Sequence, residues 1–373
     1  MSDELSTMAD AELREELLSR VEKIRDVLTR TAAESEDARF LVPEAVAALR
    51  DNGLLRMKAA REVGGLDATP TTQMLVIAAL SEIDAAAGWN AMVNNNSTGF
   101  MSAFLPDEAV AEVFAGDEPP VAAGVAPPMG RARRTDGGYL LTGRWKTCSG
   151  VRQSTWLRLT GALEDEPDAF VFCVLPQADV QIHDTWHVLG LRGTGSYDVS
   201  VTGYFVPARR ALTQEVRYRG GPQYRLRGLG ASSYEHTGIA LGMGRRAVKE
   251  LAAYAARKGS PREALLVDLG RTDVAVRAAQ AVAVSTYESI YRLLLDDSAD
   301  VTNAGQPGQA VAAYATRVAL DAVETMYRYT GTSGLYLPNP FEKLLRDVQA
   351  ALAHVAVGEN HFRDLGAALV AQV

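Results

Sequence analysis

The chain of 373 residues is 47% hydrophobic and 23% charged, which allows two or three folded domains and excludes a disordered protein. A net charge of −8 argues against nucleic acid as the main partner, and two cysteines cannot form a disulfide framework or a thiolate zinc site. No histidine pair has convincing metal-ligand spacing, so we expect no metal. The acidic N-terminus lacks a signal-peptide layout and no uncharged stretch suits a bilayer, so we expect a cytoplasmic protein without a membrane span.

Residues 1–117 are expected to form a helical domain. Apolar residues recur there at helical spacing, at Leu17, Val21, Ile24 and Leu28. Pro43 is placed to begin a second helix that ends at Gly53, because proline suits a first turn and glycine suits a C-terminus. After the turn at Gly64 and Gly65, a more apolar helix is predicted from about residue 71 to 87.

Residues 118–228 change character and are expected to form a β domain. Short runs rich in β-branched and aromatic residues follow at roughly ten-residue spacing, at 138–145, 155–163, 169–176, 180–186 and 197–207. Glycine, aspartate and proline separate them, a pattern that predicts an antiparallel barrel or sandwich.

Residues 229–373 are expected to form a four-helix bundle. Long segments rich in alanine, leucine and valine are predicted at about 234–258, 262–296, 308–331 and 341–371. Gly242 and Gly244 match a dinucleotide-binding pattern, but no strand precedes them, so we interpret them as contacts between closely packed helices.

This order of helices, β domain and bundle resembles the acyl-CoA dehydrogenase fold, and four local motifs agree. They are LVPEAVAALRDNGLLRMKAA, TGRWKTCSG followed by STWLRL, WHVLGLRGTGSYDVSVTGYFVP, and RDVQAALAHVAVGENHF. The resemblance covers nearly the whole chain. It implies an α+β protein with an N-terminal helical domain, a middle antiparallel β domain and a C-terminal four-helix bundle, assembled as a homotetramer.

Two subfamilies share this fold, the dehydrogenases of acyl-CoA thioesters and the oxygenase components of two-component flavin monooxygenases. The dehydrogenases carry a glutamate base about two turns after an Arg-Asp pair in the last helix. Counting from Arg346 and Asp347, that place holds Val355, with His354 beside it. Some dehydrogenases keep this glutamate at the start of the first bundle helix, which here falls near Ser232 and Ser233. Neither serine is an acid, but Glu235 lies within a turn of them. Glu359 lies a turn beyond Val355.

The segment before the β domain also departs from the dehydrogenases. They typically carry Thr-Glu-Pro there, whereas this chain has VAAGVAPPMGRARR. Both departures favour the oxygenases, a group similar to the hydroxylases of hydroxyphenylacetate and of secosteroid phenols.

This resemblance implies a reduced-flavin-dependent monooxygenase. Such a protein accepts reduced FMN or FAD from a separate flavin reductase, forms a C4a-hydroperoxyflavin with molecular oxygen, and hydroxylates an aromatic or amine-containing small molecule. A flavin-dependent acyl-CoA dehydrogenase that uses Glu235 or Glu359 is the alternative. A third interpretation is a flavin-binding or ligand-binding homologue without catalysis.

The resemblance also assigns candidate catalytic residues. Ser149 lies where these proteins place a serine against the flavin, and its hydroxyl would hold the proton on flavin N5. His354 is the candidate base, since an imidazole with an ordinary pKa near 6.5 suits deprotonation of a phenol at neutral pH. A lone histidine in an apolar helix is also often a core residue. His361, seven residues on, would present a second ring on the same helix face.

Further residues are candidates for binding. Those for the cofactor are Trp145, Ser149, Arg192, Gly193, Thr194, Gly195 and Ser196, and those for the substrate are Trp89, Asn94, Asn96, His236 and His361. Either Trp145 or Trp156 would stack on the flavin, or both pack the β core. The glycine-rich run 193–196 is either a binding loop or an ordinary turn. The polar side chains of residues 94–98 either line a cavity or bind neighbouring backbone, and a cavity is our preferred interpretation.

Overall fold

The computed structural model describes residues 2–116, 118–166, 168–336 and 339–371. Its N-terminal part is helical, with α1 (Ser2–Thr7), α2 (Asp10–Lys23), α3 (Arg25–Ala38), α4 (Pro43–Asp51), α5 (Pro70–Ile83), α6 (Ala85–Phe104) and α7 (Asp107–Val113). Pro43 begins α4 as predicted, and Gly53 follows it with a φ of +74°. The expected helix from 71 to 87 is divided at Asp84, because this side chain caps α6 by accepting from Ala87 N at 3.1 Å.

The strands form a mixed sheet in the order β5-β6-β2-β1-β3-β4-β7. They are β1 (Ala122–Thr135), β2 (Gly138–Cys148), β3 (Trp156–Leu163), β4 (Phe170–Pro176), β5 (Gln181–His183), β6 (Tyr197–Pro207) and β7 (Ala211–Leu212). The expected β domain is confirmed, but its description as antiparallel needs a correction, because β1 pairs with β3 in parallel. Sequence patterns also missed β1. Its register shifts between Val125 and Gly130, around two prolines that cannot donate to a ladder.

The C-terminal part contains α8 (Ser233–Lys258), α9 (Glu263–Leu294), α10 (Gln306–Thr330), α11 (Pro340–Leu352) and α12 (Asn360–Val370). The first three match the predicted helices closely. The fourth prediction, one helix over 341–371, is wrong in extent because α11 ends at Leu352 and a 3₁₀ turn, Val355–Val357, separates it from α12. His354 adopts an extended backbone there, and its ring accepts a hydrogen bond from Ala356 N. The bundle is thus completed by the shorter α11.

Close packing between α5 and α8 joins the N-terminal helices to the bundle. A Cβ atom at Gly238 would lie 2.6 Å from the carbonyl oxygen of Met74, and one at Gly242 would lie 2.4 Å from that of Ala78. Only glycine allows this approach. The contact at Gly242 confirms that the motif containing Gly242 and Gly244 serves helix packing. A shared apolar core extends across both regions, and the sheet encloses a second core.

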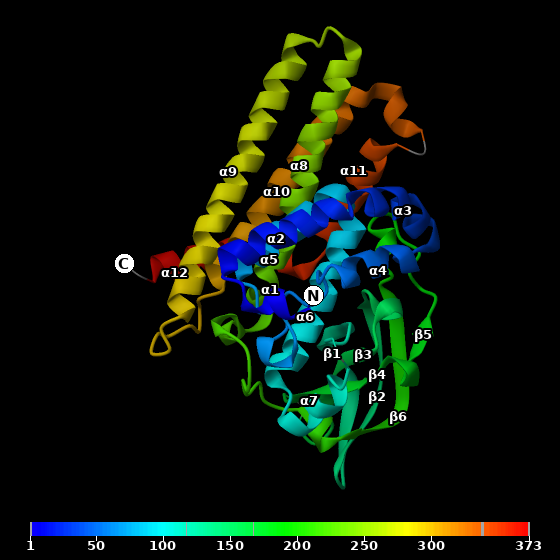
Figure 1. Cartoon of the computed structure of the whole chain (residues 1–373), viewed down its shortest axis with the longest axis vertical. Helices are drawn as coiled ribbons and strands as arrows, with labels where there is room; N and C mark the ends of the chain where they lie inside the picture. The colour runs from blue at the N-terminus through cyan, green and yellow to red at the C-terminus, as the bar shows by residue number, and fades with distance from the viewer. Residues whose placement is uncertain (1, 117, 167, 337–338, 372–373) are drawn as a thin grey trace.

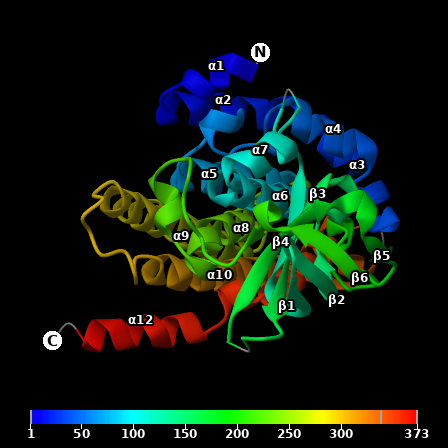
Figure 2. The same cartoon turned by 90° about the horizontal axis from the view of Figure 1, so that it is seen from below.

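Figure 1 shows the long α8–α9 hairpin extending beyond the other elements, with the sheet at the opposite end of the molecule. Figure 2 shows α12 at one edge, on the side opposite α1 and α2. No helix in the described part of the chain combines the length and apolarity that crossing a bilayer requires. The domain limits at residues 117 and 228 stay a prediction.

Candidate active site

Three aromatic rings from distant segments meet where α6, the start of α8 and the end of α11 come together. The rings of His236 and His354 stack with centroids 4.5 Å apart and planes inclined by 30°. The indole of Trp89 meets both edge-on, at 5.8 Å from His236 and 5.6 Å from His354. Two of the predicted substrate-binding residues are therefore in contact with the predicted catalytic histidine.

A chain of hydroxyl groups starts at the same indole. Trp89 Nε1 donates to Ser149 Oγ at 3.2 Å, Ser149 Oγ lies 2.6 Å from Ser196 Oγ, and Ser196 Oγ lies 2.7 Å from Thr194 Oγ1. The turn after β2 and the turn before β6 are tied together because Gly150 N donates to the carbonyl oxygen of Thr194 at 3.0 Å. Ser149 and His354 thus belong to one cluster, connected through Trp89.

Hydrogen bonds fix the tautomers of the two imidazoles. His236 Nδ1 lies 2.9 Å from the carbonyl oxygen of Ser232, which only accepts, so Nδ1 carries the hydrogen and Nε2 has a lone pair. That Nε2 atom is buried and has no hydrogen-bond partner among the described residues. His354 Nδ1 accepts from Ala356 N at 3.2 Å, so a neutral His354 carries its hydrogen on Nε2. The pair therefore offers one acceptor and one donor.

This tautomer changes the role expected of His354. A base needs a free lone pair, and the lone pair of neutral His354 is occupied by Ala356 N. His236 has the unoccupied lone pair instead. The sequence interpretation assigned His236 only to substrate binding, since the direction of its Nδ1 hydrogen bond has no signature in the sequence.

Both rings are neutral near pH 7. Burial, helped by the neighbouring His354, lowers the pKa of His236 from its ordinary value of 6.5 to about 3. Burial also lowers the pKa of His354. The His236 lone pair is therefore free of a proton throughout the neutral range, although the ring is a weak base.

This depressed pKa predicts a loss of stability in acid. Below pH 6.5 the unfolded chain binds a proton at His236, whereas the folded chain does so only near pH 3, so the free energy of unfolding falls as the pH falls between these values. We expect His236 to contribute a loss of about 2 kcal/mol between pH 7.5 and pH 5. Urea unfolding of the native protein and of His236→Asn at both pH values measures this contribution. An equal acid loss in the two proteins would contradict it.

Trp145 does not belong to the site. Its side chain is completely buried in the core of the sheet, where Nε1 donates to the carbonyl oxygen of Thr160 at 2.7 Å. The ring packs directly against Gly130 and Gly143, so it has no free face for a flavin. The prediction of flavin stacking by Trp145 is therefore wrong, whereas Trp156 remains only partly buried.

The asparagines of α6 bind protein atoms. Asn94 Nδ2 donates to the carbonyl oxygen of Ala122 at 2.9 Å, and its Oδ1 accepts from Gln153 at 3.0 Å. Asn96 Nδ2 donates to a carboxylate oxygen of Glu235 at 3.0 Å. Of the two interpretations of this polar run, binding to backbone holds for Asn94, which fastens α6 to β1, whereas Asn96 binds a side chain and fits neither. The preferred cavity interpretation is corrected for both amides.

The remaining candidates lie around the cluster. His361 is on α12, not on the helix that precedes His354, and its Nε2 lies 3.0 Å from the carbonyl oxygen of Val355. The expectation of two rings on one helix face is therefore wrong. Arg192 Nε donates to the carbonyl oxygen of Glu36 at 3.3 Å, and the Gly193 carbonyl accepts from Asn90 at 3.2 Å. Gly195 has a φ of +57°, which shapes the turn that presents Ser196.

A network of charges that sequence analysis did not find supports this turn. Lys343 Nζ lies 2.6 Å from Asp347 and 3.2 Å from Asp84, the cap of α6. Asp347 also accepts from Leu191 N at 2.6 Å, which holds Leu191 in its left-handed backbone conformation. Although burial alone would lower it, the carboxylates of Asp347 and Asp84 raise the pKa of Lys343. The network therefore joins three site-bearing segments: α6, the 191–196 turn and α11.

Comparison with known proteins agrees with this architecture. The sequence model of the acyl-CoA dehydrogenase N-terminal domain matches residues 10–109, and that of the C-terminal domain matches residues 234–359. The chain belongs to the acyl-CoA dehydrogenase superfamily.

Within this superfamily, the chain is similar to proteins named as oxygenases. It is 28% identical to indole-3-acetate monooxygenase from Pseudomonas putida, over 90% of this chain and 88% of the relative. It is 27% identical to the oxygenase component of the FADH2-dependent resorcinol hydroxylase from Rhizobium sp., over 91% of this chain and 90% of the relative. The structure of XiaF from Streptomyces sp., in complex with FADH2 and glycerol, matches with a TM-score of 0.89 and 25% identity over 97% of this chain and 96% of XiaF.

Glu235 and Glu359 are the two candidates for the base of a dehydrogenase, and both carboxylates already bind other side chains of the protein. The buried Glu235 carboxylate accepts from Lys58 at 3.4 Å and from Asn96 at 3.0 Å. Burial raises the pKa of Glu235, while Lys58 and Asn96 oppose the rise. Glu359 is 79% exposed and pairs with Arg317 at 2.8 Å. Neither residue offers a free carboxylate to the cluster.

The cluster has two open hydrogen-bonding positions, and the one on Ser149 fits the polar edge of a flavin, the cofactor that membership of this superfamily implies. Ser149 Oγ has one hydrogen and two lone pairs but, among the described residues, bonds only to Trp89 and Ser196, so one position stays open. The orphaned His236 Nε2 provides a second open position. Buried polar atoms without partners are costly, so the buried His236 Nε2 indicates a group that binds there, whereas the partly exposed Ser149 Oγ offers a position that a ligand can reach.

Proposed function

We propose that this protein is the cytoplasmic, homotetrameric oxygenase component of a two-component flavin-dependent monooxygenase. It takes reduced FMN or FAD from a separate reductase and uses molecular oxygen to hydroxylate an aromatic or amine-containing small molecule. The observation that carries this proposal is the cluster of Trp89, Ser149, His236 and His354, which offers two imidazoles and a hydroxyl. Neither Glu235 nor Glu359 offers it the free carboxylate that a dehydrogenase needs. The relatives named as FADH2-dependent and as monooxygenases support the proposal.

Each residue of the cluster has a different role in this proposed reaction. When bound, reduced flavin supplies the two electrons that activate oxygen. Ser149, with the turn over residues 192–196, would hold the flavin ring through hydrogen bonds. His236 Nε2 accepts the hydrogen of a substrate hydroxyl or ring N–H, which increases the electron density of the aromatic ring. His354 Nε2–H donates to the oxygen that is transferred, and the Trp89 indole excludes water from both imidazoles.

This donor and acceptor pair selects a class of substrate. An electron-rich ring that carries a hydroxyl or N–H group would satisfy His236 Nε2, the buried atom that lacks a partner. The relatives are named for indole-3-acetate and resorcinol, and both compounds carry such a group. We infer that the substrate is a phenol, an indole or a related amine.

The tetramer would bury an apolar surface on α9. Leu266, Val267, Val274 and Val282 are between 44% and 58% exposed along this helix. Exposed apolar residues repeated along one helix favour contact with other subunits of a bundle.

Incubation of the purified protein with reduced FAD, labelled molecular oxygen and a panel of phenols and indoles tests the function. We expect a product that contains one labelled oxygen atom, detected by mass spectrometry. Anaerobic reduction of the bound oxidised flavin by an acyl-CoA thioester would instead establish the dehydrogenase. Failure to bind flavin in either redox state would leave only the non-catalytic interpretation.

A further inference from the structure

The hydroxyl chain that ends at Ser149 has a fixed direction. Thr194 Oγ1 lies 2.8 Å from the carbonyl oxygen of Leu191, which only accepts, so the single hydroxyl hydrogen of Thr194 points to Leu191. Thr194 must then accept from Ser196. Because the hydrogen of Ser196 is used in this way, Ser196 accepts from Ser149. The hydrogen of Ser149 therefore points away from Trp89, to Ser196.

The opposite direction is disfavoured. It would place lone pairs of Thr194 Oγ1 and of the Leu191 carbonyl against each other at 2.8 Å, in a place where Thr194 is 1% exposed. No water reaches this contact to separate them, and an unmade hydrogen bond at a buried site is costly.

The direction decides what Ser149 can still bind. An indole N–H only donates, so the bond from Trp89 Nε1 fills one lone pair of Ser149 Oγ. The hydrogen of Ser149 is directed to Ser196, and one lone pair remains. Towards a ligand, Ser149 is therefore an acceptor and not a donor.

We propose that Thr194 and Ser196 are positioning residues that make the site select reduced over oxidised flavin, an inference that rests on the proposed function. The N5 atom of a reduced isoalloxazine carries a hydrogen, and the same atom of the oxidised ring has only a lone pair. Because Ser149 only accepts, it can bind the N5–H group of the reduced ring. Against the oxidised ring it would place its lone pair opposite the lone pair of N5. The oxygenase would thereby bind the form delivered by its reductase and release the oxidised form after turnover.

Binding measurements on Thr194→Val test this inference without turnover. Valine keeps the shape of threonine but accepts no hydrogen bond, so Ser196 can donate to Ser149, and the Ser149 hydrogen becomes free to reach oxidised N5. The dissociation constants of oxidised and of reduced FAD are measured separately by anaerobic equilibrium titration. We expect their ratio, oxidised over reduced, to fall about tenfold, equivalent to about 30 mV in the two-electron potential of the bound flavin.

Thr194→Ser is the matched control, because it keeps the hydroxyl and should keep the native ratio. If Thr194→Val does not fold, Ser196→Ala removes the acceptor of Ser149 and should lower the ratio in the same direction. A native ratio in every folded variant would overturn the inference. A native protein that binds neither FAD nor FMN, in either redox state, would instead contradict the proposed function itself; if it binds only FMN, the same titrations are made with FMN.

Discussion

Replacement of His236 by asparagine is expected to lower the rate of product formation about 100-fold and to leave the affinity for reduced flavin unchanged. The asparagine amide can keep the hydrogen bond to the Ser232 carbonyl, but it removes the Nε2 lone pair. General acid–base groups contribute about 10²- to 10⁴-fold. The lower end applies here because the pKa of about 3 makes His236 a weak base. Single-turnover assays with a phenol substrate measure the effect.

His354→Gln is the matched variant for this experiment. The glutamine amide can keep a donor close to the position of the His354 Nε2–H, so we expect a loss of less than about tenfold if donation is the role of His354. A greater loss in His354→Gln than in His236→Asn would exchange the two assignments and restore His354 as the base.

Replacement of Lys343 by methionine is expected to lower the free energy of unfolding by about 3–5 kcal/mol. The change leaves Asp84 and Asp347, each with a side chain only 3% exposed, buried without their cation. Breaking a buried ion pair from one side is costly because the remaining charge loses its compensation. Urea unfolding at fixed protein concentration and neutral pH measures the loss.

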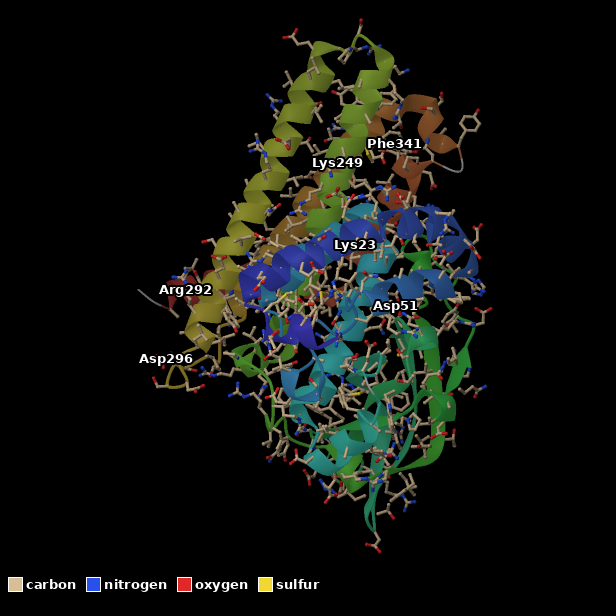
Figure 3. The ribbon with its side chains drawn as sticks, in the orientation of Figure 1. Lys23, Asp51, Lys249, Arg292, Asp296 and Phe341 are labelled. Atoms are coloured by element: carbon tan, nitrogen blue, oxygen red, sulfur yellow. The ribbon has the colours of Figure 1, made fainter. Side chains whose placement is uncertain are left out.

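Lys249→Met provides the control on the same molecule. Lys249 lies on α8 (Figure 3). It is 69% exposed and pairs with Glu82, so its loss should cost less than about 1 kcal/mol. Equal costs for the two variants would show that the Lys343 network does not hold the site-bearing segments together.

Much of the fold follows from local patterns, because it depends on periodicity and end signals. The helices α8, α9 and α10 follow their apolar repeats, and α4 begins at its proline. The break after α11 was missed because a single side chain, His354, provides the hydrogen bond that stabilises the turn over 355–357. The strand β1 was missed because its two prolines resemble a loop and its pairing with β3 is non-local.

The site was predictable as a set of residues but not as a geometry. Ser149, Ser196, His236 and His354 were all candidates, and the structure places them in one cluster. Trp145 was misassigned because a strand pattern predicts alternation of side chains but not which face meets a ligand. The Lys343 network was not found because its partners come from α6, α11 and the 191–196 turn. Such contacts between distant segments leave no local pattern in the sequence.

The long sequence separations within the cluster have a consequence for folding in the cell. Trp89, Ser149 and His236 come from segments that meet only when the N-terminal helices, the sheet and the bundle have docked. Contacts between such distant segments form late, so a partly folded chain has no complete cluster. A ligand that needs all these segments binds the native state alone and stabilises it by mass action. The supply of reduced flavin would then influence how much folded oxygenase the cell maintains, in addition to how fast that oxygenase works.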